Sequence, residues 1–287
     1  MNDIAFIGAG RVATTLSQAL ANAGWSVKAV ASKTMGSAEA LASLLPNCQS
    51  VSVAEASQHP LVFLTVTDDA ISSVCSELTW HTGQSVIHCS GATELLALES
   101  AATQGAQVGG FHPLQIFSDP QSALRNLPGS SVSIEAADPA LATMLRDMAH
   151  ALGMHPFDLP AGTRALYHAS AGYAASLLLP LLHEAVQLWR ELGVDETQAL
   201  RALLPLAKGT LASVERRGLA GALSGPLSRG DLGVLKKHCN ALDGLGGEHL
   251  TLYKTLTRLQ WPLLKGSNRN WESSRQDVEA LLGNLPG

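Results

Sequence analysis

The N-terminal residues contain a glycine turn with the spacing of a dinucleotide site. Gly8, Gly10 and Ala13 give the pattern GxGxxA between an apolar run at 4–7 and a helical pattern at 14–23. In a strand–turn–helix setting, the first glycine permits the tight turn, the second lets a pyrophosphate approach the backbone, and the alanine keeps the helix close to the strand. Free N–H groups at the helix N-terminus would hold the phosphates. The predicted cofactor contacts here are Gly8, Ala9, Gly10, Arg11 and Val12.

The residues after the second predicted strand bear on which nicotinamide cofactor is bound. An NAD-specific site usually places an acidic residue about 20 residues beyond the glycines, where it holds the ribose 2′-hydroxyl. Here the strand is followed by Ser32 and Lys33, and the first acid, Glu39, lies well inside the next helix. A hydroxyl and a lysine suit a 2′-phosphate, which Arg11 could also hold with its planar guanidinium. Both cations could instead be solvated surface charges, but the missing acid favours NADP over NAD.

A histidine in the C-terminal half is the predicted proton donor of a hydride-transfer reaction. Such a reaction requires the nicotinamide to be held against the substrate carbon. It also requires a proton or hydrogen-bond donor that stabilises or protonates the substrate oxygen or nitrogen. His168 suits this role because the pKa of an imidazole is readily tuned. Arg164 lies four residues earlier on the same helical face, so it could hold a substrate carboxylate in the same cleft. The alternative for His168 is a buried, hydrogen-bonded histidine at a domain interface.

Polar residues also follow three of the predicted strands. His112, just before Pro113, could line the nicotinamide pocket or donate to substrate, or it could be an ordinary loop histidine. Ser90 could hydrogen-bond substrate or the carboxamide, although serine is equally a common turn and cap residue. Val66, at the end of the predicted strand 61–66, and Thr67, which follows it, are predicted to contact the cofactor.

A glycine-bounded loop, GPLSRGD at 225–231, lies in the helical half. Arg229 could clamp an anionic substrate in bidentate fashion, across a dimer interface in one version of this hypothesis. Asp231 is more simply interpreted as the cap of the helix that begins at Leu232, with Arg229 paired to it.

His183 and Glu184 do not have the HExxH spacing, and the other histidines form no ligand set, so we predict no metal.

Alternating strand and helix patterns must position these residues. The predicted strands cover 4–7, 26–31, 61–66, 85–89, 107–111 and 131–134, and helical patterns separate them. From Thr163 onward only helical periodicities occur, at 163–192, 197–216, 232–239, 247–264 and 273–282, and Pro180 is expected to kink the first. The sequence therefore predicts an α/β fold: a Rossmann domain over 1–160, with a doubly wound, mostly parallel sheet, and an all-α domain over 161–287.

Composition excludes several classes of protein. The 287 residues are 46% hydrophobic and 15% charged, with a net charge of -5, so no nucleic-acid partner is expected. Four widely spaced cysteines predict neither disulfides nor zinc and fit a reducing cytoplasm. The longest apolar stretch, at about 174–182, is shorter than a membrane span, so no membrane partner is expected.

Apolar helical surface around 177–182 and Trp189 predicts a homodimer through the C-terminal helices, with a larger monomeric core as the alternative.

Five segments taken in order carry a family resemblance. They are LTVTDDAI at 64–71, IHCSGA at 87–92, GFHPLQIF at 110–117, LYHA at 166–169 and SGPLSRGD at 224–231. Together they resemble bacterial proteins in which a Rossmann-like domain precedes a helical domain known as DUF2520. That family is similar to the 6-phosphogluconate dehydrogenase-like superfamily, which includes pyrroline-5-carboxylate and ketopantoate reductases. The resemblance implies an NADP-dependent oxidoreductase with a substrate-binding or dimerising helical domain.

One departure from the family leaves two functions open. Similar proteins commonly have asparagine eight residues after His168, where this chain has Ser176, a predicted substrate contact with a shorter side chain. The first hypothesis is a reductase of a small carbonyl or imine substrate that bears a carboxylate, such as a ketopantoate-like compound or an imino acid. The alternative is an NADP-binding regulatory or scaffold protein without turnover.

Overall fold

The structure is a computed structural model that describes residues 3–264 and 272–285. The chain divides into two compact units, residues 1–177 and 178–287. The first contains all of the strands found in the described residues, and the second is helical there.

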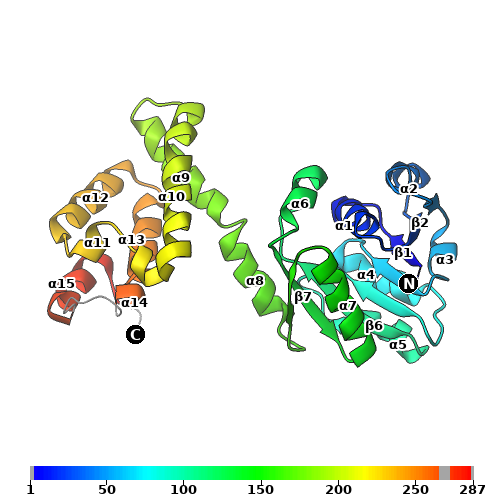
Figure 1. The fold of residues 1–287 in the computed structure, drawn as a ribbon. Helices are drawn as coiled ribbons and strands as arrows, with labels where there is room; N and C mark the ends of the chain where they lie inside the picture. The colour runs from blue at the N-terminus through cyan, green and yellow to red at the C-terminus, as the bar shows by residue number, and fades with distance from the viewer. Residues whose placement is uncertain (1–2, 265–271, 286–287) are drawn as a thin grey trace. The chain divides into compact units, whose positions relative to one another are not determined.

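The first unit is built on an eight-stranded sheet with the order β3-β2-β1-β4-β5-β6-β7-β8 (Figure 1). Only the β6–β7 pair is antiparallel, so the predicted mostly parallel, doubly wound sheet is confirmed. The strands are β1 Ile4–Ile7, β2 Val27–Ala31, β3 Gln49–Ser50, β4 Leu61–Leu64, β5 Ser85–His88, β6 Gln107–Pro113, β7 Ser131–Ala136 and β8 His155–Asp158.

Alternate residues of the central strands face two separate cores. Phe6 and Phe63 stack on one face at 5.1 Å, while Val62 and Leu64 point to the other. Both faces are covered by helices, which is why these strands are apolar throughout. One face is covered by α1 Arg11–Asn22, α2 Met35–Ala42 and α7 Pro139–Ala151, and the other by α3 Val53–Ala56, α4 Ile71–Ser76 and α5 Glu99–Thr103. Two short helical turns, η1 Asp68–Ala70 and η2 Leu95–Leu98, and helix α6 Pro120–Asn126 complete the connections.

The two edge strands were not predicted from the sequence. β3 has only two residues, and β8 is mostly exposed and contains Pro156, which is tolerated at a sheet edge. β6 also runs two residues beyond its predicted end, because its antiparallel pairing with β7 continues to Pro113. His112 is therefore a strand residue rather than a loop residue.

Helix α8, Arg164–Ala174, belongs to the first compact unit although the predicted domain boundary lies at 160. Polar contacts from its first residue, Arg164, attach it to the sheet. The helix ends before a turn at 175–177, where Ala175 has φ -125° and ψ -88°. The predicted long helix at 163–192 is thus two helices, and Pro180 lies in the first turn of the second, where a missing N–H is tolerated.

The second unit contains the helices that follow. They are α9 Leu178–Glu191, α10 Glu196–Ala222, α11 Pro226–Arg229, α12 Leu232–Leu245, α13 His249–Leu259, α14 Trp261–Leu264 and α15 Glu272–Leu282. α10 changes direction at Gly218, whose φ of 69° and ψ of 175° are not helical. The buried core of this unit comes from α11, α12, α14, α15 and the residue Leu285.

One segment of the described chain, residues 164–191, is long and apolar enough to cross a membrane by length and composition alone. From the sequence we expected the apolar stretch to be too short to span a membrane, but the length of this segment does not exclude a transmembrane helix. This is weak support for a membrane location, because the turn at 175–177 interrupts the segment and helices of soluble proteins meet the same criterion. The cytoplasmic location stays a prediction.

Candidate functional site

The glycine turn between β1 and α1 has the close approach that its spacing predicts. Gly8 has φ +109°, and a Cβ there would lie 2.6 Å from the carbonyl carbon and oxygen of Thr65, in the segment after β4. The Thr65 hydroxyl donates to the Gly8 carbonyl at 3.0 Å. A side chain at residue 8 would therefore push β1 away from the segment that follows β4. At Gly10, in contrast, the position of a Cβ is open to more than 4 Å.

The N-terminus of α1 is left free for an anion. Gly10 is its N-cap, no side chain caps it, and its first turn contains no acidic residue. The N–H groups of the first turn therefore have no side-chain acceptor from the cap. Together with the helix dipole, they suit the pyrophosphate of a dinucleotide. The residues present thus fit the phosphates of NADP.

The predicted 2′-phosphate residues are accessible. Arg11 and Lys33 are exposed, and neither forms an ion pair with any residue in the described ranges. Ser32 and Lys33 directly follow β2 and precede α2, whose N-cap Thr34 makes no side-chain cap hydrogen bond. Thr67, after β4, precedes the η1 turn, and Val66 packs partly into the core. Cofactor contacts by these residues stay predictions.

Two of the predicted catalytic histidines meet at the carboxyl end of β5. A Cβ at Gly91 would lie 2.8 Å from Nε2 of His112 and 2.8 Å from Cδ2 of His168. The two imidazole centroids are 6.1 Å apart, with the rings nearly perpendicular. Because residue 91 has no side chain, both ring edges occupy the space over this turn. Ligands of open α/β sheets bind at this edge, outside the carboxyl ends of the strands.

Tyr167 completes this cluster. Its phenolic oxygen lies 2.7 Å from Nδ1 of His112. Burial, followed by the positive charges of protonated His168 and of Arg164, lowers the pKa of His112 to about 4. His112 is therefore neutral at neutral pH, with one ring nitrogen available as a donor and the other as an acceptor.

Arg164 is fully buried over a row of residues that crosses three strands. Its Nε donates to Glu135 at 2.7 Å, and its Nη1 donates to the carbonyl of Ser90 at 2.8 Å. In the sheet, His88 pairs with Gly110 and Gly110 pairs with Glu135. The guanidinium occupies the space that glycine leaves, since a Cβ at Gly110 would lie 2.0 Å from Nη2. In this geometry Arg164 has no exposed surface for a substrate carboxylate, and its charge is held by Glu135.

His88, at the other end of this row, is kept neutral by its surroundings. Burial lowers its pKa to about 3, and the positive charge of Arg164, together with that of His112 when it is protonated, acts in the same direction. Its Nδ1 accepts from the backbone N–H of Ser90 at 3.3 Å. Nε2 of His88 and Nη2 of Arg164 are buried without a hydrogen-bond partner among the described residues. A buried donor without a hydrogen-bond partner costs folding free energy. A change of charge at His88, Arg164 or Glu135 is therefore expected to affect stability.

The helical spacing of α8 matches the spacing of the sheet beneath it. Arg164 lies over Gly110, whereas Tyr167 and His168 lie against His112, two residues further along β6. Two strand residues span about 6.6 Å, which compares with about 4.5–6 Å for three or four helical residues. Glu94 fixes the start of the helix, because its carboxylate accepts the backbone N–H groups of Gly162 and Arg164.

Ser90 has the structural role that was the alternative to catalysis. Its hydroxyl donates to Thr93 Oγ1 at 2.9 Å and accepts the backbone N–H groups of Ala92 and Thr93. These bonds stabilise the turn that carries Gly91. The hydroxyl is already engaged and 6% exposed, so this geometry offers no support for a catalytic role.

The remaining predicted substrate residues are exposed. Ser176 is exposed in the turn after α8. Arg229 is exposed at the end of α11, in the second compact unit. Asp231 accepts from the backbone N–H of Val234 at 3.1 Å, which confirms that it caps α12. In the described part of the chain, no group of three or more His, Cys, Asp or Glu residues could hold a metal ion.

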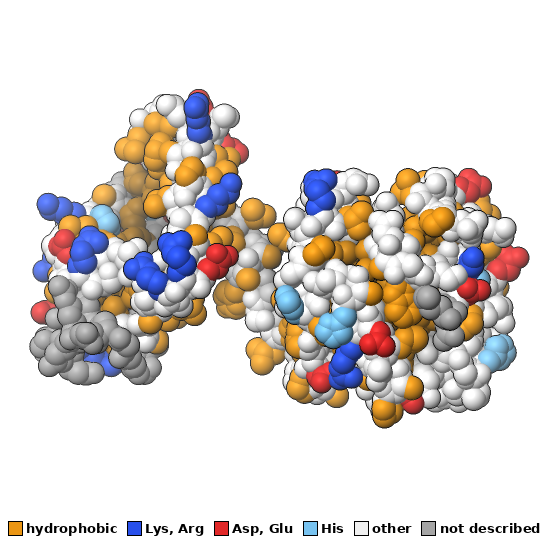
Figure 2. All heavy atoms as spheres, viewed as in Figure 1, with side chains coloured by type: hydrophobic (Ala, Val, Ile, Leu, Met, Phe, Trp, Pro, Cys, Tyr) orange, Lys and Arg blue, Asp and Glu red, His pale blue; other side chains and the backbone are white. Residues whose placement is uncertain are grey.

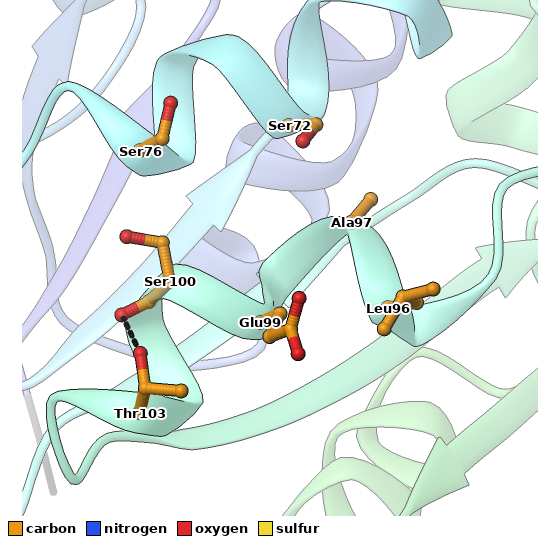
Figure 3. A pocket seen from close by; sticks show the side chains of 7 residues that line it. All are labelled: Ser72, Ser76, Leu96, Ala97, Glu99, Ser100 and Thr103. Carbon is orange, nitrogen blue, oxygen red and sulfur yellow. Dashed lines mark hydrogen bonds between the residues drawn. The ribbon is translucent and has the colours of Figure 1, made fainter.

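A pocket of about 430 Å³ lies elsewhere in the first unit (Figure 3). Ser72 and Ser76 of α4 face the segment 96–103 across it, and Glu99 supplies its charged side chain. It contains none of the predicted site residues and no histidine.

Two family models match consecutive parts of this chain. The Rossmann-like domain model matches residues 2–113, and the model of DUF2520, a domain of unknown function, matches residues 130–260. The chain therefore contains a Rossmann-like domain followed by a DUF2520 domain. The DUF2520 match begins just before β7 and ends at residue 260, so it includes Glu135 and α8 as well as helices α9 to α13. The cluster around Gly91 therefore combines β5 and β6 of the Rossmann-like domain with α8 of DUF2520.

Solved structures share this fold across nearly the whole chain. A Bacteroides fragilis protein provisionally named an NADP oxidoreductase is 24% identical, covering 90% of this chain and 96% of that chain, with a TM-score of 0.71. An Aspergillus terreus reductive aminase, solved with NADPH and ethyl levulinate, is 17% identical, with 98% of both chains covered and a TM-score of 0.67. The pyrroline-5-carboxylate reductase of Streptococcus pyogenes is 15% identical, with 99% of both chains covered and a TM-score of 0.61. Among curated proteins, none matches this chain.

Sequence reasoning did not single out four residues of this region: Tyr167, Glu135, Gly110 and His88. Tyr167 could have been found, because it precedes His168 and lies three residues after Arg164 on the same helix. Glu135 and Gly110 carry no such local signal, since only the β6–β7 register places them together.

Proposed function

We propose that this protein is an NADP-dependent oxidoreductase that reduces a small carbonyl or imine substrate. The observation that carries this proposal is the meeting of His112 and His168 at Gly91, at the end of β5. The open glycine turn and the uncapped N-terminus of α1 support a bound dinucleotide in the same unit. The named oxidoreductases that share its fold support the same class of reaction, in particular those named for NADP or solved with NADPH.

Bound NADPH would supply the hydride for such a reaction. The chain's own contribution is to polarise the substrate C=O or C=N group and to supply a proton to its oxygen or nitrogen. His168 is the proposed proton donor, because its ring lies at Gly91 and its exposure lets it exchange protons with water. His112, neutral and half-buried, suits hydrogen bonding rather than proton release.

We still propose that the substrate bears a carboxylate, but the candidate residue that binds it is Arg229 instead of Arg164. Arg164 is fully buried and paired with Glu135. Arg229 is exposed and is the remaining predicted arginine for an anionic substrate. Loss of affinity for keto or imino acids in Arg229→Met, with NADPH affinity unchanged, is the expected result, and unchanged substrate affinity would exclude this role.

Calorimetric titration with NADPH and NADH in parallel tests the cofactor. The expected result is tight binding of NADPH and at least about tenfold weaker binding of NADH, a difference of about 1.4 kcal/mol. The protein is then screened with keto acids, ketones and cyclic imines for loss of NADPH absorbance. If neither nucleotide binds, the proposed function is wrong.

His168→Ala distinguishes an enzyme from a non-catalytic NADP-binding protein. For the enzyme, the variant should lose about 100-fold or more in kcat while it retains its affinity for NADPH. The regulatory or scaffold alternative predicts that the wild-type protein binds NADPH and oxidises it with none of the substrates.

We further propose a homodimer through the C-terminal helices. Leucines of α9 and α10 are exposed and lie outside the core of the second unit, for example Leu179 at 66%, Leu206 at 69% and Leu219 at 63%. Figure 2 shows hydrophobic side chains at the surface over these two helices. A second copy could bury this apolar surface in an isologous interface. Light scattering after gel filtration should give twice the chain mass of 30.0 kDa, and Leu206→Glu should lower it to one chain mass. A monomeric wild-type protein would exclude the dimer.

A further inference from the structure

We propose that Tyr167 is a positioning residue that holds His112 as its Nε2–H tautomer, so that this imidazole donates a hydrogen bond to the substrate heteroatom beside His168. The inference rests on the reductase function proposed above. It adds a division of roles between the two histidines, as well as a residue that acts through one of them.

The first step concerns the single proton of the Tyr167 hydroxyl. Its oxygen lies 2.7 Å from Nδ1 of His112, a normal length for a hydrogen bond to a neutral ring. Ser133 pairs with His112 in the sheet, and its buried hydroxyl, which makes no hydrogen bond of normal geometry to the described residues, lies beside the phenol as a donor. Burial raises the pKa of Tyr167, and the effect of this donor is to lower it. The proton of Tyr167 therefore has His112 Nδ1 as its acceptor. A neutral imidazole that accepts at Nδ1 carries its own proton at Nε2.

The second step concerns the direction of that Nε2–H group. Nε2 of His112 lies against Gly91, where a Cβ would approach it to 2.8 Å, and the edge of His168 reaches the same place. The opposite edge of the His112 ring is held by Tyr167, with the two ring planes at 87°. The donor therefore faces the carboxyl end of β5, and the acceptor faces α8.

The third step separates the roles of the two rings. The low pKa of His112 means that it is not an imidazolium at neutral pH, so it can polarise a C=O or C=N bond as a neutral donor while it keeps its proton. His168, exposed at the same turn, supplies the proton that completes the reduction and regains one from water. Without the Tyr167 hydroxyl, Nδ1 loses its donor, and the Nδ1–H tautomer, which presents no donor at Gly91, becomes populated.

The tautomer can be measured in the full-length protein without substrate or cofactor. Nitrogen NMR of protein labelled with ¹⁵N-histidine distinguishes protonated from unprotonated ring nitrogens, and His112→Gln assigns the signals. At pH 7 we expect His112 with a proton at Nε2 and a hydrogen-bonded, unprotonated Nδ1. Tyr167→Phe should change the Nδ1 signal, whereas Tyr173→Phe, at a 74% exposed position of the same helix, should not. A proton at Nδ1 in the wild-type protein would overturn the proposal.

Kinetics with a substrate from the screen provide the second readout. Tyr167→Phe should lower kcat about tenfold or more, with NADPH affinity unchanged and KM nearly unchanged, because the lost donor acts mainly in the transition state. Unchanged kcat in a variant with a changed tautomer would overturn the role in catalysis. If the wild-type tautomer is as expected but no carbonyl or imine compound is reduced, the reductase function fails while the tautomer assignment stands.

Discussion

The guanidinium of Arg164 occupies the place where Gly110 would carry a side chain. A Cβ at residue 110 would lie 2.0 Å from Nη2 of Arg164, well inside van der Waals contact. Gly110 lies between His88 and Glu135 in the sheet register, so the cation sits between a neutral imidazole and a carboxylate. This one glycine lets the first residue of α8 reach the sheet, and α8 in turn carries Tyr167 and His168.

Gly110→Ala should therefore destabilise the protein and displace α8. The added methyl group cannot be accommodated without moving a buried, ion-paired guanidinium, so we expect a loss of about 1–3 kcal/mol in the free energy of unfolding. Urea denaturation measures this loss. Gly36→Ala in α2 is the control, because a Cβ there meets nothing within 4 Å and should be neutral or slightly stabilising. Equal stability of the two variants would argue against the close approach.

Removal of either partner of the Arg164–Glu135 pair should be costly. Arg164→Met leaves the Glu135 carboxylate without its cation, and Glu135→Gln leaves a fully buried guanidinium without its anion. Each change should cost about 3–5 kcal/mol, whereas the double variant should cost less than the sum of both. Arg146→Met, at the exposed pair with Asp158, should cost under about 1 kcal/mol. Additive single changes in urea denaturation would show that the buried pair is not coupled.

Acid should destabilise the first unit through its buried histidines. The pKa of His112 is lowered to about 4 and that of His88 to about 3, from 6.5, so the unfolded chain binds more protons than the folded one between these values. Stability is thus fully present above about pH 6.5 and falls as the pH drops toward 4 and then 3, by up to about 1.4 kcal/mol per pH unit for each group.

Denaturation curves between pH 4 and 7 check this prediction with a matched pair of variants. His88→Gln should flatten the pH dependence because one of the two titrating groups is removed. His183→Gln, at an exposed position of α9, should leave the slope unchanged. A wild-type stability that does not change between pH 4 and 7 would contradict the neutral, buried state of both histidines.

Cofactor preference should depend on Arg11 and Lys33. Neither cation has an ion-pair partner in the described residues, so each is available to a 2′-phosphate. Arg11→Ala and Lys33→Ala should each weaken NADPH binding about tenfold, or about 1.4 kcal/mol, with little effect on NADH. Calorimetry with both nucleotides measures the difference. Equal weakening of NADPH and NADH would indicate contact with the shared part of the cofactor instead.

Local sequence patterns determined the glycine turn, the central strands and the change to helices near residue 163. These features follow from a few adjacent residues: Gly8 needs its φ of +109°, and uniformly apolar strands are those buried on both faces. Asp231 as a helix cap is equally local, because its carboxylate reaches an N–H three residues away. The edge strands β3 and β8 escaped prediction because short, exposed strands lack that apolar pattern.

Only the tertiary structure decided which predicted residues act together. His112 and His168 were singled out from their types, but their meeting at Gly91 depends on how α8 lies on the sheet. Arg164 is predicted from the sequence to hold a substrate carboxylate and is instead buried, because Gly110 leaves room for it and the antiparallel β6–β7 register brings Glu135 alongside. Contacts between residues far apart in sequence are set by register and packing, which no local pattern encodes.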